Sequence, residues 1–362
     1  MIYRAIGIMS GSSLDGLDIA FVTFTETGGK WEFEILAADC TAYENQLAQK
    51  LQRATTLSAL EYQLLHSSFG HFIGQQINTF IKKNDLEHKV HLIASHGHTT
   101  FHLPAQKMTA QLGDGAAIAA ETQLPVVTDL RAMDVAFGGQ GAPIVPKGEQ
   151  LLFPDYKYFL NIGGITNISI NNQGKFIGFD ICAANRVLNM LAEETGNKYD
   201  AGGNMAASGN INESLLNTLN ELNYYQQQFP KSLDNSFGTD IVYPIIRDAK
   251  ISTADALRTY TEHICLQIKN DISKHRLSGN QKMLVTGGGA FNTFLISSLS
   301  NQLAVFGITV IVPDEKLVAY KEALIMALLG ILRWREEANV LPSVTGAVKA
   351  SIGGALWLGN EA

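Results

Sequence analysis

Residues 7–21, GIMSGSSLDGLDIAF, place a loop of small and polar residues inside an otherwise apolar run. The flanking segments, YRAIGIM and LDIAFVTF, are rich in Ile, Val and Phe, which is typical of β-strands. They predict a hairpin closed by SGSSLDG. The chain contains no GxxxxGK[ST], and the residues after the loop alternate like a strand instead of opening a helix. The loop is therefore neither a P-loop nor a dinucleotide-binding fingerprint.

The same arrangement starts again near residue 150. YKYFLNIGGITNISI predicts strand, glycine loop and strand, and GKFIGFDIC a third strand, as WEFEILAADC does after the first hairpin. Each half then continues with helices and a buried strand that ends in a polar or glycine loop, HLIASHGHT in the first half and KMLVTGGGAFN in the second. This order predicts two α/β domains of common ancestry, residues 1–150 and 151–362. Helical stretches near 183–196, 212–228 and 252–276 lengthen the second domain.

Composition narrows the class of protein. Lys and Arg number 27 against 34 Asp and Glu, a net charge of −7, and no basic stripe is present, so we expect no nucleic-acid partner. Cys40, Cys182 and Cys265 lie far apart without CxxC spacing, which indicates reduced thiols and a cytoplasmic location. No secretory signal is visible. The most apolar helical stretch, EALIMALLGILRW, is shorter than the roughly 20 residues that span a bilayer, so we expect no membrane span.

Glycine-containing loops recur at three strand ends: SGSSLDG, Gly163–Gly164 and Gly287–Gly289. Glycine lets backbone N–H groups converge on an anion, and Ser12, Ser13 and Thr166 offer hydroxyl donors. The alternative is that the glycines only satisfy tight turns. Recurrence across a duplicated pattern favours phosphate binding. Hairpins that hold a triphosphate indicate the architecture shared by actin, the 70-kilodalton heat-shock ATPases and the sugar kinases.

A kinase of this architecture needs a base beside the acceptor. Asp180, in FIGFDICAAN, follows a buried apolar strand and precedes small residues, which would hold its carboxylate on a rigid element. The alternative is that Asp180 caps the helix expected near Ala183. Asp15 either forms a turn or contacts Mg²⁺ or substrate. We expect Mg²⁺ because it neutralises the charge of a triphosphate.

Two further segments carry candidate side chains. SHGHTTFHLP contains His96, His98 and His102, which could bind zinc, contact a polar substrate or fill structural roles. No carboxylate or cysteine stands nearby at ligand spacing, which disfavours zinc. In PVVTDLRAMDVAFGGQGAPIVP, Arg131 could bind a substrate carboxylate while Asp134 accepts sugar hydroxyls. The alternative is a mutual ion pair at i, i+3.

Eight motifs follow one another along the chain: GIMSGSSLDGLDIA, SHGHTTFHLP, QLGDGAAIA, PVVTDLRAMDVAFGGQGAPIVP, NIGGITNIS, YDAGGNMAASG, VTGGGAFN and VTGA. In this order they resemble the anhydro-N-acetylmuramic acid kinases, from about residue 5 to residue 355. The first and fourth motifs are highly specific, whereas glycine loops alone would not be. This resemblance implies the duplicated two-domain α/β fold of actin-like ATPases and sugar kinases, with an interdomain cleft.

The resemblance also implies a reaction. The family uses ATP and water to convert 1,6-anhydro-N-acetylmuramic acid into N-acetylmuramic acid 6-phosphate, which recycles cell-wall sugar. Water attacks the anomeric carbon while the released 6-oxygen attacks the γ-phosphate. A related sugar kinase that phosphorylates a free hydroxyl is the alternative. Family members are commonly dimers, so the expected partners are a small amino-sugar substrate and a second copy of the chain.

Roles carry over residue by residue to matching positions. Asp180 would activate the water. The residues implied to bind nucleotide are Gly11, Ser12, Ser13, Leu14, Asp15, Gly16, Leu17, Asp18, Gly163, Gly164, Gly287, Gly288 and Gly289. The residues implied to line the sugar pocket are His96, His98, Thr99, Arg131 and Asp134.

This sequence departs from the family pattern at three places. Ser12 stands where the family usually has Thr, which keeps the hydroxyl. His98 stands where Gln is usual. After Asp180 the family typically has Thr-Gly-Pro, whereas Ile181–Cys182–Ala183 follow here, so we expect a different path for this loop.

Overall fold

The structure is a computed structural model, and it describes residues 1–11, 14, 16–229, 231–234 and 236–359. The chain forms two compact units. The first comprises Met1–Pro154 together with Tyr320–Ala362, and the second comprises Asp155–Ala319.

The first unit is built on one mixed sheet with the strand order β12-β6-β4-β1-β2-β3, and β5 also pairs with β4. The hairpin β1–β2 and strand β3 are antiparallel, whereas β4 runs parallel to both β1 and β6. The strands are β1 (Ile2–Ser10), β2 (Leu17–Thr27), β3 (Lys30–Thr41), β4 (Leu92–Leu103), β5 (Met108–Leu112), β6 (Val126–Thr128) and β12 (Ala355–Trp357). The helices are α1 (Asn45–Gln52), α2 (Ala59–Lys83), α3 (Gly115–Thr122), α4 (Ala132–Ala136), α5 (Val145–Leu152), α12 (Glu315–Trp334) and α13 (Pro342–Thr345).

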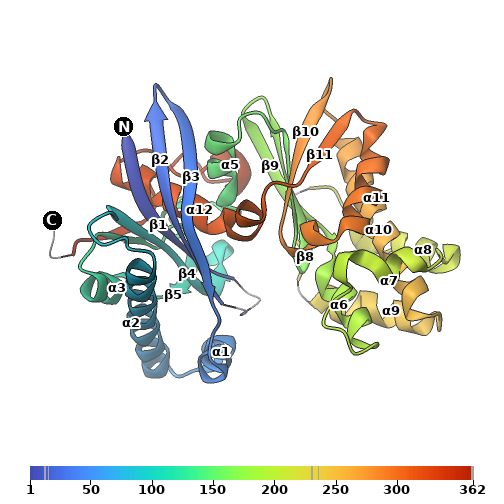
Figure 1. Cartoon of the computed structure of the whole chain (residues 1–362), viewed down its shortest axis with the longest axis horizontal. Coiled ribbons are helices and arrows are strands. Elements are labelled where there is room, and N and C mark those ends of the chain that lie inside the picture. Colours follow the sequence, from blue (N-terminus) through green and yellow to red (C-terminus); the bar gives the residue numbers. More distant parts are fainter. Residues whose placement is uncertain (12–13, 15, 230, 235, 360–362) are drawn as a thin grey trace. The chain divides into compact units, whose positions relative to one another are not determined.

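Helices cover both faces of this sheet. Helix α2 starts at a capping box formed by Ser58 and Glu61, and its buried stripe packs on Ile6 and Ile8 of β1. Helix α12 lies on the opposite face, so close that a Cβ at Gly7 would sit 1.8 Å from the carbonyl oxygen of Ala323. Only glycine permits this approach. Figure 1 shows α2 and α12 on the two sides of strands β1 to β3.

The second unit repeats the same sheet. Its strand order, β11-β10-β7-β8-β9, matches β6-β4-β1-β2-β3, with the same antiparallel hairpin, third strand and parallel neighbours. This match supports the predicted duplication. The strands are β7 (Tyr158–Ile162), β8 (Ile165–Asn172), β9 (Lys175–Ala183), β10 (Gln281–Thr286) and β11 (Ile308–Ile311). The helices are α6 (Asn185–Glu193), α7 (Asn204–Ser208), α8 (Glu213–Asn220), α9 (Tyr243–Asp248), α10 (Thr253–Lys274) and α11 (Thr293–Ala304).

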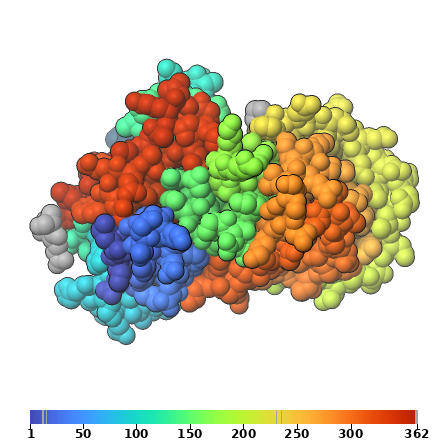
Figure 2. All heavy atoms as spheres, turned by 90° about the horizontal axis from the view of Figure 1, so that it is seen from above, coloured from blue at the N-terminus to red at the C-terminus, as the bar shows by residue number. Residues whose placement is uncertain are grey.

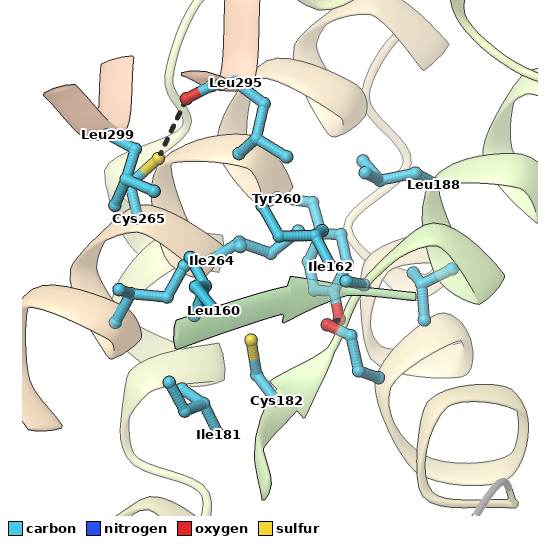
Figure 3. Close-up of a cluster of buried hydrophobic side chains, with 14 of the residues drawn as sticks. Leu160, Ile162, Ile181, Cys182, Leu188, Tyr260, Ile264, Cys265, Leu295 and Leu299 are labelled. Carbon is cyan, nitrogen blue, oxygen red and sulfur yellow. Dashed lines mark hydrogen bonds between the residues drawn. The ribbon is translucent and has the colours of Figure 1, made fainter. Parts of the chain in front are cut away.

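Helix α10 forms the centre of the second core. Figure 3 shows its side chains Tyr260, Ile264 and Cys265 between the sheet and α11. The hydroxyl of Tyr260 donates to the carbonyl oxygen of Ala183 over 2.7 Å, which fixes the end of β9 against this helix. The last strand residues before α6 therefore rest on a fully packed core.

Three expectations differ from the structure. The chain returns to the first unit at Tyr320, where α12 departs from helical angles, so residues 151–362 do not form one compact unit. Figure 2 shows this returning segment, in red, against the blue N-terminal strands. The helix expected at 212–228 covers only Glu213–Asn220, followed by a short 3₁₀ turn. Strand β4 continues through Leu103 because β5 pairs with it, so SHGHTT is strand and not loop.

Candidate functional site

Asp180 lies on β9 at a β-bulge. Thr166 of β8 pairs with Cys182, and Asn167 pairs with Asp180, so Ile181 is an extra residue without an opposite partner. Bulges re-aim side chains and often occur beside active sites. Helix α6 begins only at Asn185, so the alternative in which Asp180 caps it is wrong.

The carboxyl group of Asp180 is held by the backbone of a distant segment. The N–H of Leu233 donates to Asp180 Oδ2 over 2.9 Å, and the N–H of Asp180 donates to the carbonyl oxygen of Lys231. The hydroxyl of Tyr224 donates to the carbonyl oxygen of Asp180 over 2.7 Å. Burial raises the pKa of Asp180, and the hydrogen bond from Leu233 opposes this shift. A raised pKa makes the carboxylate a stronger base than an exposed aspartate.

A buried ion pair anchors that segment. Lys231 Nζ lies 2.9 Å from Asp271 Oδ2 on α10, and the side chains are only 2% and 7% exposed. The ammonium group also lies over the rings of Phe179 and Tyr224. Sequence analysis missed Lys231, because a single lysine in a polar stretch carries no periodic or spacing signal.

The hairpin glycines and the third glycine loop meet at the start of α6. The N–H groups of Ala184 and Asn185 donate to the carbonyl oxygens of Gly164 and Gly163, at 2.8 and 3.0 Å. The side chain of Asn185 donates to the carbonyl oxygen of Ile162 over 3.1 Å. It also contacts the loop Gly287–Gly289, whose glycines 288 and 289 face it. Asn185 therefore joins the two predicted phosphate loops, a role that sequence analysis missed.

The glycines of this region serve different purposes. A Cβ at Gly289 would lie 2.2 Å from Ile162, and one at Gly287 would lie 2.6 Å from Asn161, so tight packing requires both. At Gly163, Gly164 and Gly288 a Cβ would meet nothing nearer than 3.4 Å, and none of these three has a positive φ. Neither packing nor backbone conformation explains them. Access of a ligand to the backbone would explain them.

Thr166 does not serve this loop. Its side chain is fully buried in β8, so the hydroxyl predicted to face phosphate lies inside the core.

The first glycine loop is described only in part. Ser12, Ser13 and Asp15 lie outside the described residues. Leu17 is fully buried in the core, and Gly16 packs so tightly on β3 that a Cβ would lie 2.6 Å from Cys40 Sγ. The other described members of the predicted set are Gly11, Leu14 with φ of 58°, and Asp18, which pairs opposite Met9 at the start of β2.

Ser10, just before this loop, connects it to β4. The Tyr43 hydroxyl donates to Ser10 Oγ over 2.7 Å, and Ser10 Oγ lies 3.1 Å from His98 Nδ1. Since the Ser10 oxygen accepts from Tyr43, its own proton is free to donate to Nδ1. His98 then carries its proton on Nε2. Burial lowers the pKa of His98, so the ring is neutral and presents an N–H donor.

His96 orients Arg131. The ring donates from Nδ1 to the carbonyl oxygen of Gly97, and Nε2 accepts from Arg131 Nε over 2.8 Å. Burial, together with the charge of Arg131, lowers the pKa of His96 to about 3. Arg131 Nη1 donates to the carbonyl oxygen of Gly141, which leaves Nη2 for another partner. Both ring nitrogens of His96 are used, so it supports Arg131 and is not open to a ligand.

The alternative in which Arg131 and Asp134 form a mutual ion pair is wrong, because each side chain has other partners. Asp134 is fully buried, and its two oxygens accept from the N–H of Gly141 and the hydroxyl of Thr345, both over 2.7 Å. In this arrangement the carboxylate shapes the glycine turn and is not open to a sugar hydroxyl. The charged neighbour of Arg131 is Glu322, which sequence analysis missed. Burial lowers the pKa of Arg131 to about 10, and Glu322 opposes this shift.

The other predicted groups on β4 face different partners. Thr99 is exposed, and its hydroxyl accepts from Gln111 over 3.4 Å. His102 lies 3.0 Å from the Thr109 hydroxyl. Among the described residues no cluster of three His, Cys, Asp or Glu side chains could hold a metal ion, so the zinc alternative finds no support.

Within the same residues, no helix has the length and apolar character needed to cross a bilayer.

Duplicated sheets, each with a hairpin, a third antiparallel strand and parallel strands, define the class of the actin-like ATPases and sugar kinases. A family model described as anhydro-N-acetylmuramic acid kinase matches residues 3–359. The chain therefore belongs to the anhydro-N-acetylmuramic acid kinase family. It is a kinase, it uses ATP, and its substrate is a small sugar molecule.

Individual relatives agree over almost the whole length. The chain is 32% identical over 366 residues to an anhydro-N-acetylmuramic acid kinase of Vibrio vulnificus strain CMCP6, which covers 97% of each chain. It is 33% identical to that of Francisella tularensis subsp. novicida strain U112, covering 94% of this chain and 95% of the relative. A solved dehydratase activator of Clostridium difficile with bound ADPNP has a TM-score of 0.48 at 12% identity, covering 92% of this chain and 96% of that chain.

Proposed function

We propose that this kinase opens 1,6-anhydro-N-acetylmuramic acid hydrolytically and phosphorylates it to N-acetylmuramic acid 6-phosphate, in the recycling of cell-wall sugar. The proposal rests on family membership and on one observation: Asp180 stands on a bulge with a raised pKa and a carboxyl group held by Leu233. A base in that state accepts a proton from water near neutral pH more readily than an ordinary aspartate.

The reaction combines ring opening by water with transfer of the γ-phosphate. Asp180 takes a proton from a water molecule whose oxygen bonds to the anomeric carbon. The bond between that carbon and the 6-oxygen breaks, and the 6-oxygen then attacks the γ-phosphate of ATP, which releases ADP. In unit two, Gly163, Gly164 and Gly288 offer backbone access to the phosphates. In unit one, Arg131 and the N–H of His98 offer donors to the sugar.

Mg²⁺ would neutralise charge on the triphosphate. The described residues hold no ready-made cluster of ligands for it, which fits a metal bound mainly through phosphate and water. We also propose a homodimer, on family resemblance, and a cytoplasmic location, which a sparse set of three cysteines without CxxC spacing favours. Sedimentation of the purified protein tests the dimer, and activity with and without a chelator tests the metal.

The decisive experiment runs the reaction in ¹⁸O-labelled water with Mg-ATP. Ring opening by water must place one solvent oxygen on the anomeric carbon, whereas transfer to a free hydroxyl places none. N-acetylmuramic acid 6-phosphate incubated alone in the same water corrects for spontaneous exchange. Unlabelled product, or faster turnover of free N-acetylmuramic acid, would support the related sugar kinase instead.

A further inference from the structure

Arg186 occupies an unusual position at the start of α6. It is the second residue of this helix, whose N-cap, Ala184, has no capping side chain and whose first turn holds no acid. The N-terminal end of a helix carries partial positive charge. A guanidinium there is repelled by the helix unless an anion lies beside it.

One nitrogen of the guanidinium, Nε, is buried and has no hydrogen-bond partner among the residues that the structure describes. Within the described residues only two buried side-chain nitrogens make no hydrogen bond, Arg186 Nε and His263 Nε2. Burial lowers the pKa of His263 to about 3, so its Nε2 is the acceptor of a neutral ring. Arg186 Nε–H is the donor of a cation, which is far more costly to leave unsatisfied.

One of the glycines without a packing role, Gly164, lies beside this side chain. A Cβ at Gly164 would lie 3.9 Å from both Nε and Cβ of Arg186. Gly163 is the next residue of the same hairpin, and Gly288 faces Asn185, the residue before Arg186. The start of α6 therefore combines a positive charge, an N–H donor without a partner at Arg186 and accessible backbone at Gly164.

We propose that Arg186 binds the phosphate chain of the nucleotide at the β7–β8 hairpin. This inference rests on the proposed function, which assigns ATP phosphate to Gly163–Gly164. A guanidinium suits phosphate oxygens because it is planar, always charged and able to donate two parallel hydrogen bonds. The phosphate supplies the acceptor that Arg186 Nε lacks and the negative charge that the start of α6 lacks.

The test compares Arg186→Gln with the matched control Arg247→Gln, an arginine of the same unit that pairs with Glu194 on the surface. Calorimetry measures the affinity for ATP, ADP and adenosine, and thermal unfolding measures the stability without ligand. We expect Arg186→Gln to weaken ATP binding about 10- to 100-fold and to leave adenosine binding unchanged. Arg186→Lys should recover part of the loss, and the control should bind ATP normally.

Stability separates a ligand role from a structural one. Removal of a half-buried cation whose Nε is unsatisfied should leave the melting temperature of the ligand-free protein unchanged or raise it, whereas loss of a structural arginine would lower it. Unchanged ATP affinity in Arg186→Gln, or an equal loss for ATP and adenosine, would overturn the assignment. If the wild-type protein binds ATP and the variant binds it equally well, only Arg186 is misassigned. If the wild-type protein binds no ATP, the proposed function itself fails.

Discussion

Strands β4 and β10 hold the same place in their two sheets, since each runs parallel to the first strand of its hairpin. Strand β4 carries three buried polar side chains, Ser95, His96 and His98. His96 contacts the side chain of Arg131, and His98 contacts that of Ser10. Strand β10 ends at Thr286 and passes into Gly287–Gly289, where side chains are absent. We infer that the two duplicated halves diverged in the kind of group that is available to bind a ligand. The first half offers oriented side chains that suit a sugar, and the second offers bare backbone that suits phosphate.

The largest effect should come from the base in the second unit. Asp180→Asn should lower kcat about 10²- to 10⁴-fold, because an amide cannot take the proton from water, and should leave ATP affinity nearly unchanged. Steady-state kinetics and calorimetry measure the two quantities. Asp234→Asn, an exposed acid in the segment that holds Asp180, is the matched control. A fully active Asp180→Asn enzyme would assign the base elsewhere.

Among the described residues each unit contains one buried lysine–carboxylate pair at 2.9 Å, Lys231–Asp271 in the second and Lys321–Glu149 in the first. Lys321→Met should cost about 3–5 kcal/mol, because Glu149 keeps no partner and its Oε2 already lacks one among the described residues. Lys231→Met should cost less, since Asp271 keeps Lys274 at 3.2 Å.

Denaturant unfolding measures the stability that each of the two variants loses. Their losses of kcat in steady-state kinetics should rank in the opposite order. Lys231→Met should reduce kcat more than Lys321→Met does, because the segment that holds Asp180 loses its anchor. A kcat for Lys231→Met equal to that of the wild type, in a folded protein, would separate the ion pair from the base.

The first unit should respond through substrate binding. Arg131→Gln should raise KM for the anhydro sugar about 10- to 100-fold by removal of a charge-assisted donor, with ATP affinity unchanged. His96→Ala should act in the same direction but more weakly, because it removes the support of Arg131 and not the donor itself. A normal sugar KM in Arg131→Gln would move the sugar site away from β4.

Acid should destabilise both units. The pKa values of His96 and His263 are about 3 in the fold, below the usual 6.5, so the unfolded chain binds more protons between these values. Stability is therefore full above about pH 6.5 and falls as the pH decreases, by about 2 kcal/mol per histidine at pH 5. His263→Leu should show a smaller loss between pH 7 and pH 5 in denaturant unfolding. An identical pH dependence in both proteins would contradict a neutral buried His263.

Two alanine substitutions sharpen the distinction between kinds of glycine in the second unit. Gly289→Ala should cost about 1–3 kcal/mol, since the new methyl group overlaps Ile162. Gly164→Ala should change stability by only about 0.5 kcal/mol, because its Cβ would meet nothing nearer than 3.9 Å. Its effect should appear as weaker ATP binding in calorimetry. Normal ATP binding by Gly164→Ala would indicate that this hairpin does not approach the phosphates.

The sequence predicts those parts of the fold that depend on residues close together in the chain. The apolar runs around SGSSLDG and Gly163–Gly164 predicted both hairpins, and the repeat order predicted two matching sheets. Long-range contacts could not be predicted in this way. Leu233 reaches Asp180 across 53 residues, and the bulge at Ile181 exists only in the pairing of β9 with β8.

Burial of the side chains also determines which partners they have, and sequence spacing alone leaves this open. Arg131 and Asp134 stand at i, i+3, yet each has other partners, because Asp134 points into the interior and Thr345 meets it there. Nothing in local composition predicts that Thr345, in the C-terminal VTGA, contacts Asp134 of α4, which lies 211 residues earlier in the chain.

The return of the chain at Tyr320 sets an order of synthesis. The second unit, Asp155–Ala319, is continuous in sequence. A ribosome therefore completes it before it makes the parts of the first unit that follow, which are most of α12, all of α13 and β12. The N-terminal strands are made first but wait for α12 to cover the face that contains Gly7, and for β12 to extend the sheet beyond β6. A premature stop after residue 319 would thus leave the first unit, which is synthesised first, incomplete. The second unit would keep all of its residues.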